Sequence, residues 1–153
     1  MIVGDFDHMG RPYVRGRLIL PRFGVDGYVD FLIDTGADST SIHPMDGERL
    51  RIPFERLQER IEFGGIGGSH PYYTEHAVLL FDDGTLIRVY SLPVTVAKPS
   101  ESINKLPSLI GRPLLNNWRM WHDPYGNRLE IVAKNATSTI RGNVADIPSF
   151  TPR

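Results

Sequence analysis

The sequence contains no cysteine, so disulfide bonds, thiol catalysis and cysteine-ligated zinc are excluded. It has no apolar run near the ~20 residues that a membrane-spanning helix needs. Its first residues, 1–5, lack the basic and apolar regions of a signal peptide. Neither sign of charge is in excess, since the formal net charge is -1 and acids and bases are interspersed. We therefore expect a cytoplasmic protein with no membrane and no nucleic-acid partner.

The length of 153 residues predicts one domain that is large enough to bury a core without a metal or disulfides. We expect this domain to span residues 1–132. Residues 133–153 are polar, contain proline and lack hydrophobic periodicity, so we expect a flexible C-terminal tail. The five histidines are scattered without metal-ligand spacing, which predicts solvated or hydrogen-bonded side chains, no metal site and no cofactor.

Most of the chain has the pattern of short strands. Turn residues between strand-like segments predict three hairpins: 13–20 with 28–33 around 24–27, 72–81 with 85–96 around 82–84, and 117–121 with 128–132 around 123–127. One short helix is expected near the C-terminal part, starting at Arg112. Many short strands with regular turns indicate an all-β fold, either a sandwich or a closed barrel.

One segment has the composition of a catalytic loop. The apolar run Phe31–Ile33 leads directly into Asp34, and a carboxylate at the end of a buried strand is costly unless other groups hold it. Thr35 can donate a hydroxyl hydrogen bond and Gly36 permits a tight backbone approach. Such a loop can tune the proton affinity of an acid. Taken alone, the triplet fits an ordinary turn equally well.

Two later segments favour the catalytic interpretation. The first is a glycine-rich hairpin tip, made of Gly64, Gly65, Ile66, Gly67 and Gly68. The second is the apolar-Gly-Arg segment Leu109–Leu115. Together with Asp34–Asp38, and in this order, they resemble the retropepsins, the retroviral-type aspartic proteases with cellular and bacterial relatives. The resemblance covers about residues 11–132.

The resemblance implies a closed β-barrel and peptide hydrolysis by a water held between two aspartates. Only one Asp-Thr-Gly occurs in the sequence, so the second Asp34 is expected from a second copy of the chain in a symmetric homodimer. Asp34, Thr35 and Gly36 then form the catalytic loop, and Ala37 and Asp38 line the peptide substrate.

Further roles follow from the same resemblance. Gly64–Gly68 would form a flap over the peptide, with Ile66 at its tip, and Arg112 would support the loop by pairing with Asp38. Arg11 faintly resembles an arginine that reaches the partner subunit. The alternative function is a catalytically silent, protease-like dimeric domain that binds peptides or acts as a scaffold, and it is motivated by Pro71, which removes a backbone donor from the flap.

Overall fold

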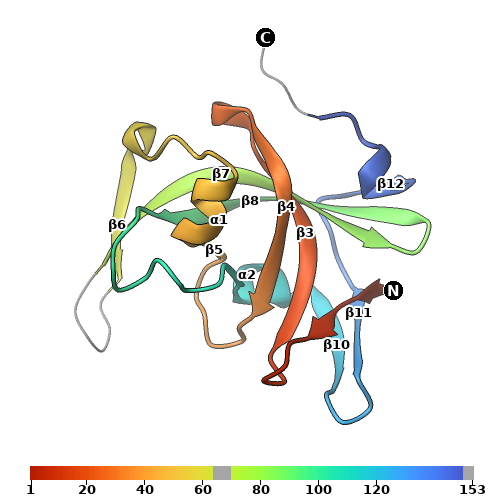
Figure 1. Ribbon diagram of the computed structural model, residues 1–153. Helices are drawn as coiled ribbons and strands as arrows, with labels where there is room; N and C mark the ends of the chain where they lie inside the picture. The colour runs from red at the N-terminus through yellow and green to blue at the C-terminus, as the bar shows by residue number, and fades with distance from the viewer. Residues whose placement is uncertain (64–69, 150–153) are drawn as a thin grey trace.

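The computed structural model describes residues 1–63 and 70–149, and Figure 1 shows the arrangement of their elements. The two α-helices of this described part are α1 (Pro44–Arg49) and α2 (Arg112–Leu115), and its short 3-10 turns are η1 (Pro21–Phe23), η2 (Phe54–Arg56) and η3 (Val144–Asp146). The strands are β1 (Ile2–Val3), β2 (Asp5–Phe6), β3 (Pro12–Leu20), β4 (Val25–Ile33), β5 (Ser41–Ile42), β6 (Glu59–Phe63), β7 (His70–Asp83), β8 (Leu86–Ala97), β9 (Leu109–Ile110), β10 (Trp118–Asp123), β11 (Arg128–Ala133) and β12 (Ser138–Arg141).

Six of the described strands close into a ring in the order β3-β4-β9-β5-β8-β7, with β7 pairing back onto β3. Most pairs are antiparallel, but β4 with β9 and β5 with β8 are parallel. A separate sheet in the order β1-β11-β10 packs beside the barrel. The predicted all-β closed barrel is therefore confirmed. A short helix in addition to the expected one, α1, occupies part of the segment between β5 and β6.

The core lies inside the barrel and continues under the β1-β11-β10 sheet. Phe31 and Phe81 are fully buried within the barrel, because alternate residues of β4 and β7 point inward. Trp118 of β10 packs edge-on against Phe81 at 5.1 Å between ring centroids, and its indole N–H donates to the Tyr90 hydroxyl at 2.8 Å. These aromatic contacts join the two sheets into one core.

All three predicted hairpins are present, but the first has a different turn. Pro21 begins the 3-10 turn η1, and Gly24 ends it with a positive φ of 66°. The segment Asp26-Gly27, which the sequence suggested as the turn, lies inside β4. Glycine is required at position 27 for packing and not for a turn, because a Cβ there would come within 2.3 Å of the Leu50 side chain.

The prediction of a flexible tail over 133–153 is wrong for the part of it that the structure describes. Strand β12 pairs antiparallel with β8, and Val144 is buried against Leu80 and Ile87. The guanidinium of Arg17 donates to the carbonyl oxygens of residues 144, 147 and 148. All four side chains of β12 are exposed, so the backbone pairing with β8 holds this strand in the sheet. For the same reason its sequence shows no hydrophobic alternation that would predict a strand.

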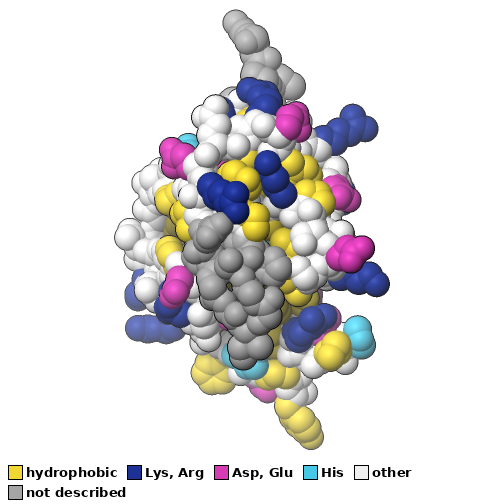
Figure 2. Space-filling model, turned by 90° about the vertical axis from the view of Figure 1, so that its left-hand side faces the viewer, with side chains coloured by type: hydrophobic (Ala, Val, Ile, Leu, Met, Phe, Trp, Pro, Cys, Tyr) yellow, Lys and Arg dark blue, Asp and Glu magenta, His cyan; other side chains and the backbone are white. Residues whose placement is uncertain are grey.

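The surface carries both signs of charge. On the face shown in Figure 2, basic and acidic side chains are interspersed, with hydrophobic side chains between them. Within residues 1–63 and 70–149, no helix is long and apolar enough to cross a bilayer.

Candidate active site

Asp34 begins the loop that follows β4, at the lower end of the barrel in Figure 1. Its backbone N–H donates to the carbonyl oxygen of Ile110 at 3.0 Å, so the parallel pairing of β4 with β9 continues up to the aspartate. The N–H of Gly36 donates to Asp34 Oδ1 at 3.0 Å, and the N–H of Ala37 donates to Asp34 O at 3.2 Å. Asp34 is half-buried, and its own loop therefore supplies one hydrogen bond to its carboxylate.

The segment after β9 supports this loop from behind. The N–H of Gly111 donates to Thr40 Oγ1 at 3.2 Å, and the N–H of Arg112 donates to the Ala37 carbonyl at 2.9 Å. A Cβ on Gly111 would lie 2.4 Å from the carbonyl oxygen of Ser39 and 2.8 Å from that of Ala37. Glycine is required here because the two backbone segments touch.

Arg112 holds the loop with its side chain as well. Its Nη1 donates to the carbonyl of Thr35 at 3.0 Å, and its Nη2 forms an ion pair with Asp38 Oδ1. A planar guanidinium makes these bonds from two nitrogens held in a fixed fork, whereas a lysine has one nitrogen and no such fork. The structure thus brings the Arg112 side chain against Thr35 and Asp38, which the sequence singled out as site residues, in the loop that Asp34 begins.

The predicted site residues differ in their exposure, and some lie outside the described part of the chain. Thr35, Gly36 and Asp38 are exposed, and Ala37 is half-buried. The predicted flap residues, 64–68, lie outside the described residues, so their role stays a prediction. Arg11 pairs with Asp7 of its own chain, Nε to Oδ2 at 2.7 Å.

A pocket of about 180 Å³ adjoins the loop, and most of its lining residues had no distinguishing signal in the sequence. It is lined by Ala37, Asp38, Ser39, Ser41, His43, Tyr72 and Leu109. His43 was expected to be solvated or hydrogen-bonded; it is 3% exposed and hydrogen-bonded at both ring nitrogens. Burial lowers the pKa of the His43 imidazole below its ordinary value of 6.5.

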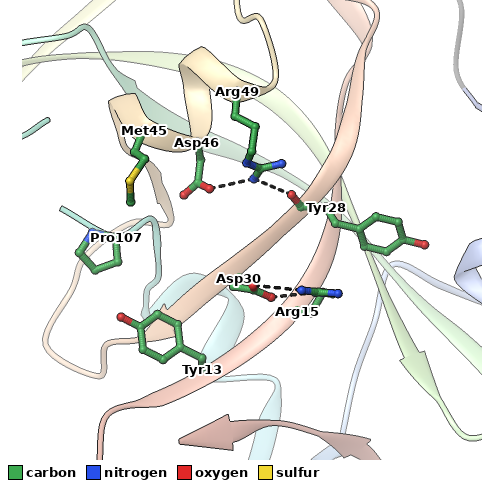
Figure 3. Close-up of a pocket in the computed structure, with 8 residues that line it drawn as sticks. All are labelled: Tyr13, Arg15, Tyr28, Asp30, Met45, Asp46, Arg49 and Pro107. Carbon is green, nitrogen blue, oxygen red and sulfur yellow. Dashed lines mark hydrogen bonds and ion pairs between the residues drawn. The ribbon is translucent and has the colours of Figure 1, made fainter. Parts of the chain in front are cut away.

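A larger hollow of about 500 Å³ lies on the outer face of β3 and β4, beside α1 (Figure 3). Two ion pairs occupy it, Arg15 with Asp30 and Arg49 with Asp46. None of residues 34–38 lines it, and its acids are already paired with arginines. The hollow therefore lacks the arrangement that an aspartate-based hydrolysis needs.

The comparisons with known proteins agree with this geometry. The family model of aspartyl proteases matches residues 24–114, which include the Asp34 loop, β9 and most of α2. The chain therefore belongs to the aspartyl protease family. No curated protein matches it significantly.

Among solved structures, the chain is similar to a retropepsin-like aspartic protease from Rickettsia conorii, with a TM-score of 0.57 and 16% identity over 86% of this chain and 97% of that one. It also resembles the EIAV protease complexed with the inhibitor HBY-793, with a TM-score of 0.49 and 18% identity over 72% of this chain and 90% of that one. The first of these likenesses shows that the fold is retropepsin-like.

Proposed function

We propose that this protein is an aspartic endopeptidase that acts as a homodimer, with the Asp34 carboxylates of two copies activating one water. The observation that carries the proposal is the support of Asp34: its carboxylate accepts from the Gly36 N–H, and its backbone is bonded to Ile110. An ordinary turn that contains aspartate also makes the first of these bonds. It does not need the contacts with Ile110, Gly111 and Arg112 that join this loop to a segment far along the chain. Membership of the aspartyl protease family is consistent with the same chemistry.

The mechanism needs two carboxylates in different protonation states. Two carboxyl groups a few ångströms apart cannot both ionise easily, so the pair shares a proton and titrates as a unit. The ionised member takes a proton from the water as it attacks the peptide carbonyl, and the protonated member donates to the carbonyl oxygen. One chain supplies one Asp-Thr-Gly, so the second carboxylate is proposed to come from a two-fold-related copy.

The peptide is proposed to lie extended across the exposed backbone of residues 36–38. Main-chain hydrogen bonds would supply much of its affinity, and side-chain pockets its selectivity. Arg112 keeps this backbone in place through Thr35 O and Asp38.

The direct test replaces Asp34 with Asn and measures cleavage of a peptide library from acid to neutral pH. We expect complete loss of cleavage. Asp30→Asn is the matched control, because Asp30 lies on β4, the strand that precedes Asp34, but its side chain is 57% exposed in an ion pair with Arg15. Cleavage that survives Asp34→Asn would refute the assignment.

Mixing the two proteins tests the dimer. If each active unit needs two intact Asp34 residues, an equal mixture of wild type and Asp34→Asn retains about one quarter of the activity of the undiluted wild type once subunits have exchanged. A remaining activity of one half would instead indicate that each chain works alone. Sedimentation at the assay concentration gives the mass of the species directly.

Binding of a statine-type mimic of the tetrahedral intermediate distinguishes the proposed peptidase from the alternative, a catalytically silent scaffold. An active pair of Asp34 carboxylates binds such a mimic far more tightly than it binds a substrate peptide. A protein that binds the ground-state peptide but neither captures the mimic nor cleaves would be the scaffold.

A further inference from the structure

The two ends of the Asp34 loop are held by different contacts. At the first end, the N–H of Asp34 donates to the carbonyl oxygen of Ile110 in β9. At the second end, the chain enters β5, a strand of only two residues that lies between β8 and β9 in the barrel (Figure 1). So short a strand makes few ladder hydrogen bonds, and side-chain contacts therefore matter for holding the second end.

The side chain that holds the second end is Thr95 of β8. It lies in the run Val94–Ala97, whose four residues are all buried, and it is the one polar residue among them, with 4% of its surface exposed. Valine has nearly the same volume and would bury no polar atom there. The hydroxyl group of Thr95 therefore needs an explanation other than packing.

The Thr95 hydroxyl contacts three consecutive residues, 39–41, which form the outgoing arm of the loop. Its Oγ1 lies 2.6 Å from Ser41 Oγ and 3.3 Å from Ser39 Oγ, and it donates to the carbonyl oxygen of Thr40 at 3.4 Å. A hydroxyl has one proton and two lone pairs, so donation to Thr40 leaves it free to accept the protons of both serines. One side chain of β8 thus fixes the whole outgoing arm.

The backbone of Thr95 makes a separate contact with the same arm. Its N–H donates to the carbonyl oxygen of Thr40 at 2.9 Å. Replacing Thr95 with valine keeps this bond and keeps a β-branched side chain in the strand. The substitution therefore removes the hydroxyl contacts while the pairing of β5 with β8 remains.

The outgoing arm is joined to the segment that supports the loop. Thr40 Oγ1 accepts from the N–H of Gly111 at 3.2 Å, and the Ser39 carbonyl lies so close to Gly111 that a Cβ there would come within 2.4 Å of it. Asp38, which directly precedes the arm, forms the ion pair with Arg112. A shift of the arm would therefore displace both the acid that holds Arg112 and the backbone on which the peptide is proposed to lie.

We infer that Thr95 is a positioning residue of this site: its hydroxyl fixes the outgoing arm, and the arm keeps Asp38 against Arg112 and the Asp34 loop in the geometry that hydrolysis needs. The inference rests on the proposed peptidase function, to which it adds a residue of β8 that acts through the residues it holds.

The test compares Thr95→Val with Thr95→Ser on the best peptide of the library. A small displacement of the reacting groups slows the chemical step more than it weakens binding of the substrate. We therefore expect Thr95→Val to lower kcat about tenfold and to leave KM within about twofold of the wild-type value. Thr95→Ser keeps the hydroxyl and should retain kcat within about threefold of the wild-type value.

Tyr90→Phe is the matched control, because Tyr90 lies on the same strand and also loses a buried hydroxyl. That hydroxyl donates to the carbonyl oxygen of Asn135 and accepts from the indole N–H of Trp118, both at 2.8 Å and both outside the loop. Each variant leaves buried groups without a partner, so both should lose stability. Only Thr95→Val should lose kcat, whereas a purely structural role for Thr95 predicts that the two variants behave alike.

Amide hydrogen exchange reports the hold on the loop without any substrate. The N–H of Gly111 is bonded to Thr40 Oγ1, and the N–H of Arg112 is bonded to the Ala37 carbonyl. In Thr95→Val these two amides should exchange about tenfold faster relative to the amides of the barrel strands, which follow global stability. Tyr90→Phe should leave this relative rate unchanged.

A second variant gives the same test if Thr95→Val does not fold. Ser41→Ala removes the shortest contact of the Thr95 hydroxyl from the other side, so it should also lower kcat and speed exchange at Gly111 and Arg112. An unchanged kcat together with unchanged exchange in this variant would contradict the inference.

Failure of this inference can be told apart from failure of the proposed function. Cleavage that depends on Asp34 but is unchanged in Thr95→Val would overturn the inference alone, and so would a Thr95→Ser variant no better than Thr95→Val. If the wild type cleaves nothing, the proposed function is wrong, and hydrogen exchange decides the role of Thr95. Faster relative exchange at Gly111 and Arg112 in Thr95→Val but not in Tyr90→Phe supports it, and equal exchange in the two variants overturns it.

Discussion

Arg17 provides the strongest test of how this fold is stabilised. Its guanidinium forms two parallel bonds with Asp26, Nε to Oδ1 at 2.7 Å and Nη2 to Oδ2 at 2.8 Å. The same group donates to the carbonyls of Val144, Ile147 and Pro148 at 2.9, 2.8 and 3.1 Å. Both side chains of the ion pair are buried, with 6% and 7% of their surface exposed. Replacing Arg17 with methionine keeps the stem and removes every one of these bonds.

The expected cost is large because the partners stay buried. A buried carboxylate that loses the cation paired with it destabilises a protein by ~3–5 kcal/mol, which is a large part of the ~5–15 kcal/mol that holds a domain together. Three carbonyl oxygens of residues 144–148 also lose a charged donor. We therefore expect Arg17→Met to lower the free energy of unfolding by ~3–5 kcal/mol.

The chain contains a matched control two residues away on the same strand. Arg15 pairs with Asp30 across β3 and β4, Nε to Oδ1 at 2.8 Å, but these side chains are 67% and 57% exposed. An exposed ion pair contributes ~0–1 kcal/mol, so Arg15→Met should change stability little. Both variants remove an arginine–aspartate pair between β3 and β4, but only the Arg17 pair is buried, and only Arg17 also donates to the carbonyls of residues 144, 147 and 148.

Urea unfolding measures the difference. With a slope of ~2 kcal/mol per molar, Arg17→Met should lower the midpoint by ~1.5–2.5 M and Arg15→Met by less than ~0.5 M. All proteins are compared at one concentration, because dimerisation would contribute to the midpoint. Hydrogen exchange should also show faster opening of residues 142–149 in Arg17→Met alone. Equal midpoints for the two variants would refute the reasoning from burial.

Three further predictions concern the site. Gly111→Ala places a methyl group 2.4 Å from the carbonyl oxygen of Ser39, so the loop must move and kcat/KM should fall at least tenfold, measured on the best library peptide. Arg112→Lys keeps the charge but loses the forked contact that includes Asp38, and the same assay should show a fall of ~10-fold or more, with an unchanged value contradicting the supporting role. The lowered pKa of His43 means that the unfolded chain binds a proton below pH 6.5 before the folded one does, so stability is fully present above that pH and declines as pH falls toward the folded pKa. His43→Gln should weaken this decline between pH 7 and 5 in urea titrations; an unchanged profile would assign the decline to other groups.

Local sequence signals were sufficient to single out the Asp34 loop. Three signals follow one another along the chain: the apolar run before Asp34, the glycine after Thr35 and the later Leu109–Leu115 segment. Each depends on residue type and short spacing, so together they identified the loop and the segment that supports it. Arg112 and Asp38 are 74 residues apart, and their pairing was expected only through a resemblance to a known family; the structure contains this ion pair.

Other features depended on packing that short sequence patterns do not encode. Asp26-Gly27 has the composition of a hairpin turn. However, Asp26 pairs with Arg17, and Gly27 leaves room for the Leu50 side chain, so both residues lie within β4 and the chain turns earlier at Pro21–Gly24. Strand β12 has only exposed side chains and looked like a tail for that reason. In each case a partner distant in sequence decides the local conformation.

The sequence by itself determined the fold class and pointed to the family: a cysteine-free, all-β chain with one Asp-Thr-Gly loop, which needs a second copy if the proposed mechanism holds. These properties are readable because they depend on residue type and short spacing. Only the tertiary structure decided that residues 138–149 belong to the folded body, that His43 is buried, and that Tyr72 and Leu109 share a pocket with Asp38. Those facts depend on which strands pair, and the ring closes through the pairing of β3 with β7, which no local pattern specifies.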